Sequence, residues 1–176
     1  MGGITNDRGG NTFIKIVEAL HDHIRLDLIG EVKDANLYDK LLTLSEQYPE
    51  SLRLHGFVSP EQGWEIAGTA DIGLSLLKPI RNYKESLPTK VLEYYALGLV
   101  PLMNDFEINK KISAELGQAF LVNHDKTTDI LNLIENLITQ KELGKLTIDQ
   151  VPRIYTSQYS WEHESKKLLN FIQDLK

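Results

Sequence analysis

The sequence predicts an α/β fold, a three-layer sandwich in which helices cover both faces of a mostly parallel sheet. Short apolar runs alternate with longer stretches whose apolar residues recur at helical spacing, and this alternation indicates a parallel sheet with helical crossovers. The run at 71–77 (DIGLSLL) is apolar almost throughout, which is expected of a strand buried on both faces. With 176 residues, the chain is long enough for one domain with a sizeable core.

Individual elements follow from apolar spacing and from turn and cap residues. Strands are expected at residues 25–29, 52–58, 71–77, 99–103 and 119–122. Helices are expected at residues 12–21, 36–48, 60–68, 89–97, 108–116, 128–139, 141–155 and 161–175. Asn11 or Thr12 would cap the first helix, and Ser59 and Ser86 would cap the helices that follow them. Gly98 lies where a left-handed helix end belongs.

Composition excludes several classes of function. The formal net charge of −6 argues against nonspecific binding of nucleic acid or of an anionic membrane, so any anion site must be local. Because the chain has no cysteine, it has no disulfide framework, no thiolate nucleophile and no zinc–sulfur site. No apolar run approaches the length of a membrane span.

Residues 1–11 (MGGITNDRGGN) form a glycine-rich, polar stretch that carries Arg8 and leads into a helix. Backbone N–H groups in such a loop, next to a helix N-terminus, favour anions, so this stretch is a candidate phosphate cradle. It is not a dinucleotide fingerprint, since G-x-G-x-x-G is absent, and it is not a Walker A loop, since Gly-Lys-Ser/Thr is absent. The alternative is a flexible start of the chain that binds no ligand.

Residues 82–101 (NYKESLPTKVLEYYALGLVP) pass from a polar loop into an apolar helix and then into a strand. Glu85 lies in the loop and Glu93 in the helix, with seven residues between them. Lys90 lies in the first helical turn, where a cation is unfavourable unless it points away or an anion occupies the exposed N–H groups. The stretch therefore predicts either a phosphate site or an ordinary amphipathic helix with a solvated lysine and a surface glutamate.

Three loops, at residues 2–10, 55–59 and 78–88, are each expected to follow a strand. Ligands of parallel sheets bind beyond the carboxyl ends of the strands, so we expect these loops to meet at one edge and to form one site.

Other groups of polar residues give weaker indications of a metal or catalytic site. His21 and His23 with Asp27 suggest a metal site, but residues two apart do not face each other on a helix. Asp105 and Glu107 are better explained as a helix N-cap and a first-turn acid. There is no G-x-S-x-G elbow, and no barrel or aromatic cluster accompanies Glu85 and Glu93 to suggest a glycosidase.

The segment ESLPTKVLEYYALGLVP at 85–101 resembles the donor-site motif of retaining glycosyltransferases of family four. The segment around Arg8 and the final helix, opened by YSWE at 159–162, are similar to further parts of that family. The resemblance implies a Rossmann-like domain, the carboxy-terminal half of a GT-B fold, over residues 1–176. Because the first motif begins at residue 2 and leaves no room for the strand expected before it, we expect the sequence to be part of a longer protein with an added initiator methionine.

The resemblance also implies roles for individual residues. Glu93 matches the glutamate that accepts hydrogen bonds from the donor ribose, and Glu85 matches the catalytic-site glutamate that faces the donor sugar. The residues implied to surround the donor diphosphate are Gly3, Arg8, Ser86, Leu87, Pro88, Thr89 and Lys90. Phe57 and Val58 match the segment around the base. Gly3 replaces an arginine common in the family, and Ser86-Leu87 replaces Gly-Phe.

The function implied is transfer of a hexosyl group from a nucleotide diphosphate sugar to a hydroxyl acceptor with retention, in polysaccharide or glycoconjugate biosynthesis. The family uses no bound metal or cofactor, and its amino-terminal acceptor domain lies outside this sequence, so the fragment alone is expected to be inactive. A cytoplasmic location is expected, with peripheral membrane association open to the full-length enzyme. The alternatives are a non-catalytic flavodoxin-like binding module or another GT-B enzyme such as an epimerase.

Overall fold

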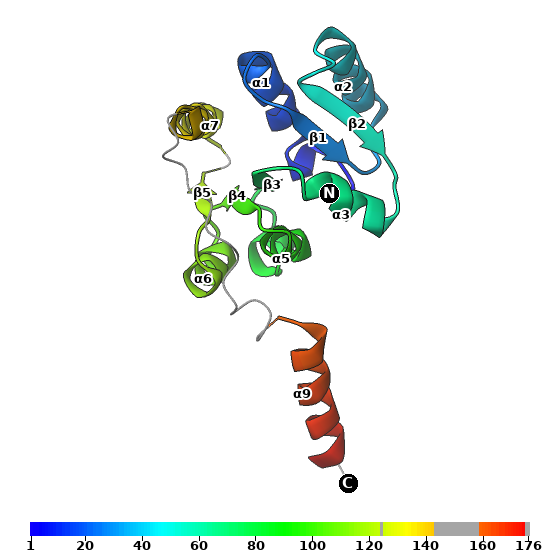
Figure 1. Ribbon diagram of the computed structural model, residues 1–176, viewed down its shortest axis with the longest axis vertical. Helices are drawn as coiled ribbons and strands as arrows, with labels where there is room; N and C mark the ends of the chain where they lie inside the picture. Colours follow the sequence, from blue (N-terminus) through cyan, green and yellow to red (C-terminus); the bar gives the residue numbers. More distant parts are fainter. Residues whose placement is uncertain (124, 143–158, 175–176) are drawn as a thin grey trace.

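A computed structural model describes residues 1–123, 125–142 and 159–174 of the chain (Figure 1). The strands are β1 (Leu26–Ile29), β2 (Leu52–Gly56), β3 (Ile72–Ser75), β4 (Val100–Asn104) and β5 (Phe120–Val122). The helices are η1 (Asn6–Arg8, a 3-10 turn), α1 (Gly10–Leu20), α2 (Ala35–Gln47), α3 (Pro60–Ala67), α4 (Arg81–Glu85), α5 (Thr89–Ala96), α6 (Glu107–Leu116), α7 (Thr127–Glu142) and α9 (Trp161–Asp174). Apart from the first residues of the helix expected at 141–155, which belong to α7, that helix lies outside the described residues.

Every strand pair in these residues is parallel, as the alternation of strands and helices predicts. The strands form two ladders rather than one continuous sheet: β1 pairs with β2, and β4 pairs with both β3 and β5. The five expected strands are all present, and most are one to three residues shorter than their apolar runs because pairing ends before the apolar residues do.

Helices cover both faces of the strands, which gives the expected Rossmann-like three-layer arrangement (Figure 1). Helices α1, α2 and α7 lie on one face, where their apolar stripes join Leu28 and Leu102 in the larger core. Helices α3, α5 and α6 lie on the other face, and a second core is built around Val91, Met103 and Ile112. Helix α9 extends away from these layers and has no buried residue.

The start of the chain is more ordered than the glycine-rich sequence suggests. A 3-10 turn precedes α1, and α1 begins at Gly10 with Gly9 as its N-cap, so the expected caps Asn11 and Thr12 are wrong. Gly9 has a left-handed φ of 91° that a side chain would disfavour, and a Cβ atom on Gly10 would lie 2.6 Å from the Leu37 side chain. Tertiary packing, and not a side-chain cap, fixes this helix start.

The segment before α5 also differs from its prediction. Residues expected as a polar loop form α4, and the Ser86 hydroxyl donates to the Asn82 carbonyl at its end. Ser86 is therefore not the N-cap of α5; that position is Pro88, which has no side-chain oxygen to offer. Likewise the N-cap of α6 is Phe106 and not Asp105. Short-range turn bonding competes with capping at such serines and aspartates.

Within the residues that the structure describes, no helix combines the length and apolar character that crossing a membrane requires.

Asn104 ties the carboxyl ends of β3 and β4 together. Its side chain is fully buried, and its Oδ1 accepts the backbone N–H of Leu77 at 2.5 Å. The backbone carbonyl of Asn104 accepts a hydrogen bond from Asn109 Nδ2 at 2.9 Å, which links β4 to α6. The strand ends from which the site loops leave are thus held by polar groups inside the core.

We expect Asn104→Ala to destabilise the fold because the N–H of Leu77 loses its buried acceptor. A buried donor left without a partner costs about 1–3 kcal/mol, which corresponds to a melting temperature lower by roughly 3–10 °C for a domain of this size. Thermal unfolding followed by circular dichroism measures this. Asn132→Ala, at an exposed position on α7, is the matched control and should leave the melting temperature within about 1 °C. Equal melting temperatures for the two variants would contradict this role of Asn104.

Candidate functional site

The first loop lies directly on the carboxyl end of β3. A Cβ atom on Gly9 would be 2.8 Å from the Leu76 carbonyl oxygen, so only glycine allows this approach. The backbone N–H of Lys78 donates to the Asp7 carbonyl at 2.8 Å, and the Lys78 ammonium pairs with the Asp7 carboxylate at 2.8 Å. The loops at 2–10 and 78–88 therefore meet, as the parallel topology predicts.

Arg8 is held between these two loops. Its Nε donates to the Tyr83 hydroxyl at 3.2 Å, and its guanidinium carbon lies 5.8 Å from the centre of the Tyr83 ring. Its terminal nitrogen Nη1 donates a longer hydrogen bond, of 3.4 Å, to the Gly3 carbonyl. Gly3 is thus beside Arg8, and a Cβ at Gly3 would lie at an ordinary contact distance of 3.5 Å from that nitrogen.

Tyr83 is a site residue that sequence reasoning missed. It lies in α4, in a segment that was expected to be a polar loop, and it contacts Arg8 across 75 positions of sequence. The available signal was an aromatic residue among polar ones, two positions before Glu85.

Lys90 of α5 lies close enough to Arg8, and to Glu93 on the same helix, for their charges to interact. Burial, followed by the nearby charge of Arg8, lowers the pKa of Lys90 to about 8, while Glu93 acts in the opposite direction. The Met1 amino group is also buried beside this cluster: burial and the charge of Lys90 lower its pKa to about 5, and Glu93 again opposes the shift. The structure therefore brings Arg8, Lys90 and Glu93 together from two distant segments.

This arrangement has the chemistry of an anion site with a neighbouring hydroxyl acceptor. Two side-chain cations are opposed by one carboxylate, and the first turn of α5 adds N–H groups that have no partner within the helix. The positive end of the helix dipole also favours an anion in this position. Glu93, one turn further along α5, is partly exposed and can accept hydrogen bonds from a pair of hydroxyl groups.

Glu85, the last residue of α4, and Thr89, the first residue of α5, are exposed. Between them lie Ser86 and Leu87, which are also exposed, and Pro88, which is partly buried. The Ser86 hydroxyl is used for the bond to Asn82, so its backbone N–H is the group it can present to a ligand. Glu85 is at the last residue of α4, in the segment that leads to the α5 N-terminus.

The third loop, at residues 55–59, passes near Gly63 of α3. Val58 and the Met1 sulfur both lie near Gly63, where an added Cβ would be 3.8 Å from each of them. Phe57 lies just beyond β2, and 88% of its surface is exposed, so it has no packing role in the fold. Of the two residues implied to surround the base, Val58 lies near Gly63 and Phe57 projects into solvent.

The described residues contain no cluster of three or more metal-ligating side chains. The sequence elements considered for a metal have other partners: the His21 ring stacks on Tyr48 with centroids 4.0 Å apart, and Asp27 binds Arg25 at 2.8 Å and His55 at 2.7 Å. Glu107 pairs with Lys110 at 2.7 Å.

Comparison with known proteins agrees with this fold. The family described as "Glycosyl transferases group 1" matches residues 1–151. One curated relative is GDP-mannose:cellobiosyl-diphosphopolyprenol alpha-mannosyltransferase of Xanthomonas oryzae pv. oryzae (strain PXO99A). It is 22% identical over 151 residues, which cover 85% of this chain and 38% of that protein.

Two solved structures have similar folds. The C-terminal domain of LpcC, a glycosyl transferase group 1 family protein from Francisella tularensis, has a TM-score of 0.71 and 18% identity, with 92% of this chain and 84% of that chain covered. HepE from Anabaena, solved in complex with UDP-glucose, has a TM-score of 0.75 and 10% identity, with 98% and 48% covered.

This chain therefore spans about half the length of HepE and less of the mannosyltransferase. Its fold is that of GT-B carboxy-terminal domains. Because the family match covers most of its residues, the chain belongs to the glycosyl transferases group 1 family.

Proposed function

We propose that the chain is the donor-binding domain of a retaining glycosyltransferase of family four, and that it binds a nucleotide diphosphate sugar at the carboxyl edge of its strands. The observation that carries this proposal is the convergence of Arg8, Lys90 and Glu93 at the N-terminus of α5. Two cations and a helix N-terminus suit a diphosphate, and a carboxylate one turn away suits the ribose hydroxyls.

In this proposal the leaving diphosphate is stabilised electrostatically. Arg8, Lys90 and the backbone N–H groups of Ser86, Leu87, Thr89 and Lys90 surround the phosphates, with Pro88 between these donors and Gly3 beside Arg8. Preformed donors of this kind stabilise the charge that develops on a leaving group without having to reorganise. Glu85 faces the hydroxyl groups of the donor sugar, and no metal ion or other cofactor is needed.

Phe57 and Val58 border the base in the proposed complex. The exposed aromatic ring of Phe57, next to Val58 in the chain, is available to pack on a planar base, and the neighbouring backbone offers polar groups. The relatives name different donors: GDP-mannose for the Xanthomonas enzyme, and UDP or UDP-glucose in the HepE complexes. The base and the sugar of this domain therefore need a direct measurement.

The proposed whole protein is a cytoplasmic hexosyltransferase of polysaccharide or glycoconjugate biosynthesis. An amino-terminal domain carries the acceptor site, so the domain alone should bind donor without transferring sugar.

Glu93→Ala should weaken the binding of the preferred nucleotide by about fivefold or more, because a charged acceptor of the ribose hydroxyls is lost. Calorimetric titration with UDP, GDP and ADP measures this and identifies the base. Glu46→Ala, on the exposed face of α2, should bind as the unchanged protein does. Saturable binding that Glu93→Ala leaves intact would remove Glu93 from the site, and a lack of binding to all three nucleotides, repeated on a full-length chain, would count against the proposed function itself.

The affinity for a nucleoside diphosphate should fall as the pH rises above about 8. The pKa of Lys90 is lowered to about 8 in the ligand-free fold, so the ammonium is largely deprotonated at pH 9.5 and no longer attracts the phosphates. We expect a dissociation constant that is nearly constant from pH 7 to 7.5 and several-fold larger at pH 9.5.

Lys90→Arg keeps its charge throughout this range and should bind with little pH dependence, whereas Lys90→Met should bind weakly at every pH. If Lys90→Met showed the same rise in dissociation constant above pH 8 as the unchanged protein, another group would be responsible.

Tyr83→Phe should weaken diphosphate binding by about two- to tenfold, because Arg8 loses its hydroxyl acceptor but keeps the aromatic ring. Tyr83→Ala, which removes both contacts, should bind more weakly than Tyr83→Phe. The same titration with the preferred nucleotide measures both, and Tyr38→Phe on α2 serves as the control. Unchanged affinity in Tyr83→Ala would mean that Arg8 is positioned without Tyr83.

A further inference from the structure

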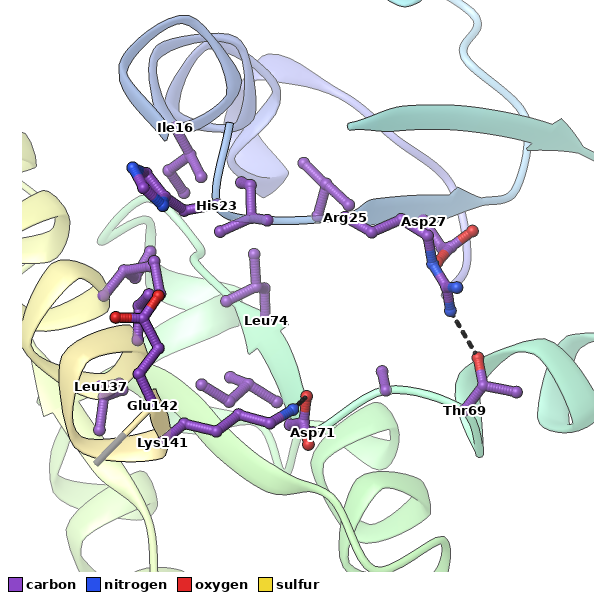
Figure 2. A pocket seen from close by; sticks show the side chains of 16 residues that line it. Ile16, His23, Arg25, Asp27, Thr69, Asp71, Leu74, Leu137, Lys141 and Glu142 are labelled. Carbon is purple, nitrogen blue, oxygen red and sulfur yellow. Dashed lines mark hydrogen bonds and ion pairs between the residues drawn. The ribbon is translucent and has the colours of Figure 1, made fainter. Parts of the chain in front are cut away.

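Lys90 differs from many other lysines of the chain in what its side-chain nitrogen meets. Several lysines place their ammonium group beside a carboxylate, which stabilises the charged form. Pairs of this kind, with N–O distances of 2.6–2.8 Å, are Lys78 with Asp7, Lys110 with Glu107, and Lys141 with Asp71, which is labelled in Figure 2. Lys90 makes no hydrogen bond or ion pair of this kind with any residue in the described part of the chain, and the cation Arg8 lies nearby.

The surroundings of Lys90 favour its neutral amine. Its side chain is partly buried, and burial followed by the charge of Arg8 lowers its pKa to about 8 against the opposing effect of Glu93. At pH 7.5 about a quarter of such amines carry no proton, compared with about one in a thousand for a lysine at its ordinary pKa of 10.5. The neutral amine has a free electron pair and is the nucleophilic form.

Lys110 shows the opposite situation on the same protein. Its ammonium group donates to the Glu107 carboxylate, and this hydrogen bond raises the pKa of Lys110. Its amine is therefore protonated almost completely at neutral pH. Lys110 provides an internal reference for a lysine that should react slowly.

The nucleophilic amine of Lys90 lies where small anions are attracted. Lys90 is the second residue of α5, so its side chain begins at the positive end of the helix dipole, beside N–H groups that have no partner within the helix. The side chains of Arg8 and Lys90 are both partly exposed, so a solute reaches them from solvent. A phosphate-bearing electrophile would therefore be held against the amine.

We propose that Lys90 is a modification site at which small acyl phosphates transfer their acyl group to the lysine nitrogen. In an acyl phosphate, a single bridging oxygen separates the phosphorus from the carbonyl carbon. A phosphate group bound to Arg8 and to the N–H groups of α5 thus brings the carbonyl carbon close to Nζ of Lys90.

The transfer needs no other reactant. The electron pair of the neutral amine attacks the carbonyl carbon, a C–N bond forms, and the C–O bond to the phosphate breaks. Inorganic phosphate leaves with the bonding electron pair, and the nitrogen releases one proton to water. Arg8 and the α5 N–H groups stabilise the charge on the leaving phosphate, and proximity of the two reacting atoms supplies the rest of the acceleration.

The expected acyl donor is an acyl phosphate and not a thioester. A thioester has no phosphate group next to its carbonyl carbon, so binding of an anion by Arg8 would not bring that carbon to the amine. The acylated nitrogen is a neutral amide. Because it uses the anion site of the proposed function, the modification would also remove one of the two cations from the donor diphosphate, and donor binding would then depend on the supply of acyl phosphate.

The first test compares acetylation rates at individual lysines. The chain is incubated with acetyl phosphate at pH 7.5, and peptide mass spectrometry follows each lysine separately from the Met1 amino group. We expect Lys90 to be acetylated at least about tenfold faster than Lys110 and than Lys40, which is exposed on α2. Equal rates at Lys90 and Lys40 would overturn the proposal.

A second test separates anion binding from the reactivity of the amine. Acetic anhydride carries no charge, so its rate at Lys90 reports the amine alone. Arg8→Gln changes the protonation of Lys90 for both reagents but removes a phosphate contact for acetyl phosphate only. The ratio of the acetyl phosphate rate to the anhydride rate should fall at least about fivefold at Lys90 and stay constant at Lys40. A constant ratio at Lys90 would reject the role of Arg8 in holding the acyl phosphate.

A third test needs no substitution and so covers the case in which Arg8→Gln does not fold. Inorganic phosphate, added at an ionic strength kept constant with sodium chloride, should slow the acetylation of Lys90 by acetyl phosphate and leave that of Lys40 unchanged. Equal rates at Lys90 with and without phosphate would contradict an anion site at this amine.

The consequence for donor binding is measured separately. The chain acetylated at Lys90, and Lys90→Gln as its mimic, should bind the preferred nucleotide several-fold more weakly than the unmodified chain. None of the acetylation measurements uses a nucleotide. Slow acetylation of Lys90 would therefore reject the modification and leave the donor site standing, whereas fast acetylation in a full-length chain that binds no nucleotide would reject the proposed function and leave the modification standing.

Discussion

The close backbone approach of Gly9 to the Leu76 carbonyl is the constraint on which the rest of the site depends. A side chain at Gly9 has no space, and the left-handed φ of this residue turns the chain from η1 into α1. The same approach allows the Lys78 N–H to reach the Asp7 carbonyl, so the first loop is fixed on the end of β3. Arg8, between these two anchors, is then directed toward α5. Two loops that are far apart in sequence are therefore brought together by backbone contacts, in which no candidate binding side chain takes part.

The closeness of the positive charges of Arg8 and Lys90 lowers the stability of the folded domain. A buried lysine prefers its neutral form, and the neighbouring Arg8 increases that preference, so the pKa of Lys90 falls from 10.5 to about 8. By linkage, the unfolded chain holds this proton more tightly, and the unfavourable contribution is fully present below pH 8 and disappears as the pH rises toward 10.5. In the proposed donor complex, an anion bound to Lys90 and Arg8 would offset the same cost at neutral pH.

Much of the fold could be predicted from the sequence because its signals are local. The apolar run at 71–77 and the alternation of strands and helices identify the strands and their parallel order. The meeting of the loops at 2–10 and 78–88 was predicted from topology, since carboxyl ends of parallel strands share an edge, whereas the grouping of Arg8 with Lys90 was implied by the family resemblance. The rest depended on contacts across the fold. The start of α1 is decided by packing around Gly9, Ser86 bonds backwards to Asn82 instead of capping α5, and Tyr83 reaches Arg8 only because α4 is folded. Gly9 and Leu76, and likewise Tyr83 and Arg8, are far apart in sequence, so no pattern of spacing could reveal their contacts, and the bond between Ser86 and Asn82, four residues apart, exists because the chain folds into α4.

The isolation of α9 affects how the unfolding of this protein should be interpreted. The Tyr159 hydroxyl, just before α9, donates to Glu115 on α6, and none of the described residues of α9 is buried. A helix of 14 residues with no buried side chain is only marginally stable in water. Its melting is therefore not coupled to that of the three layers, and helical signal is lost gradually over a wide temperature range. Heat and denaturant curves would report the cooperative unit before Tyr159, while α9 contributes a sloping baseline and almost nothing to the transition.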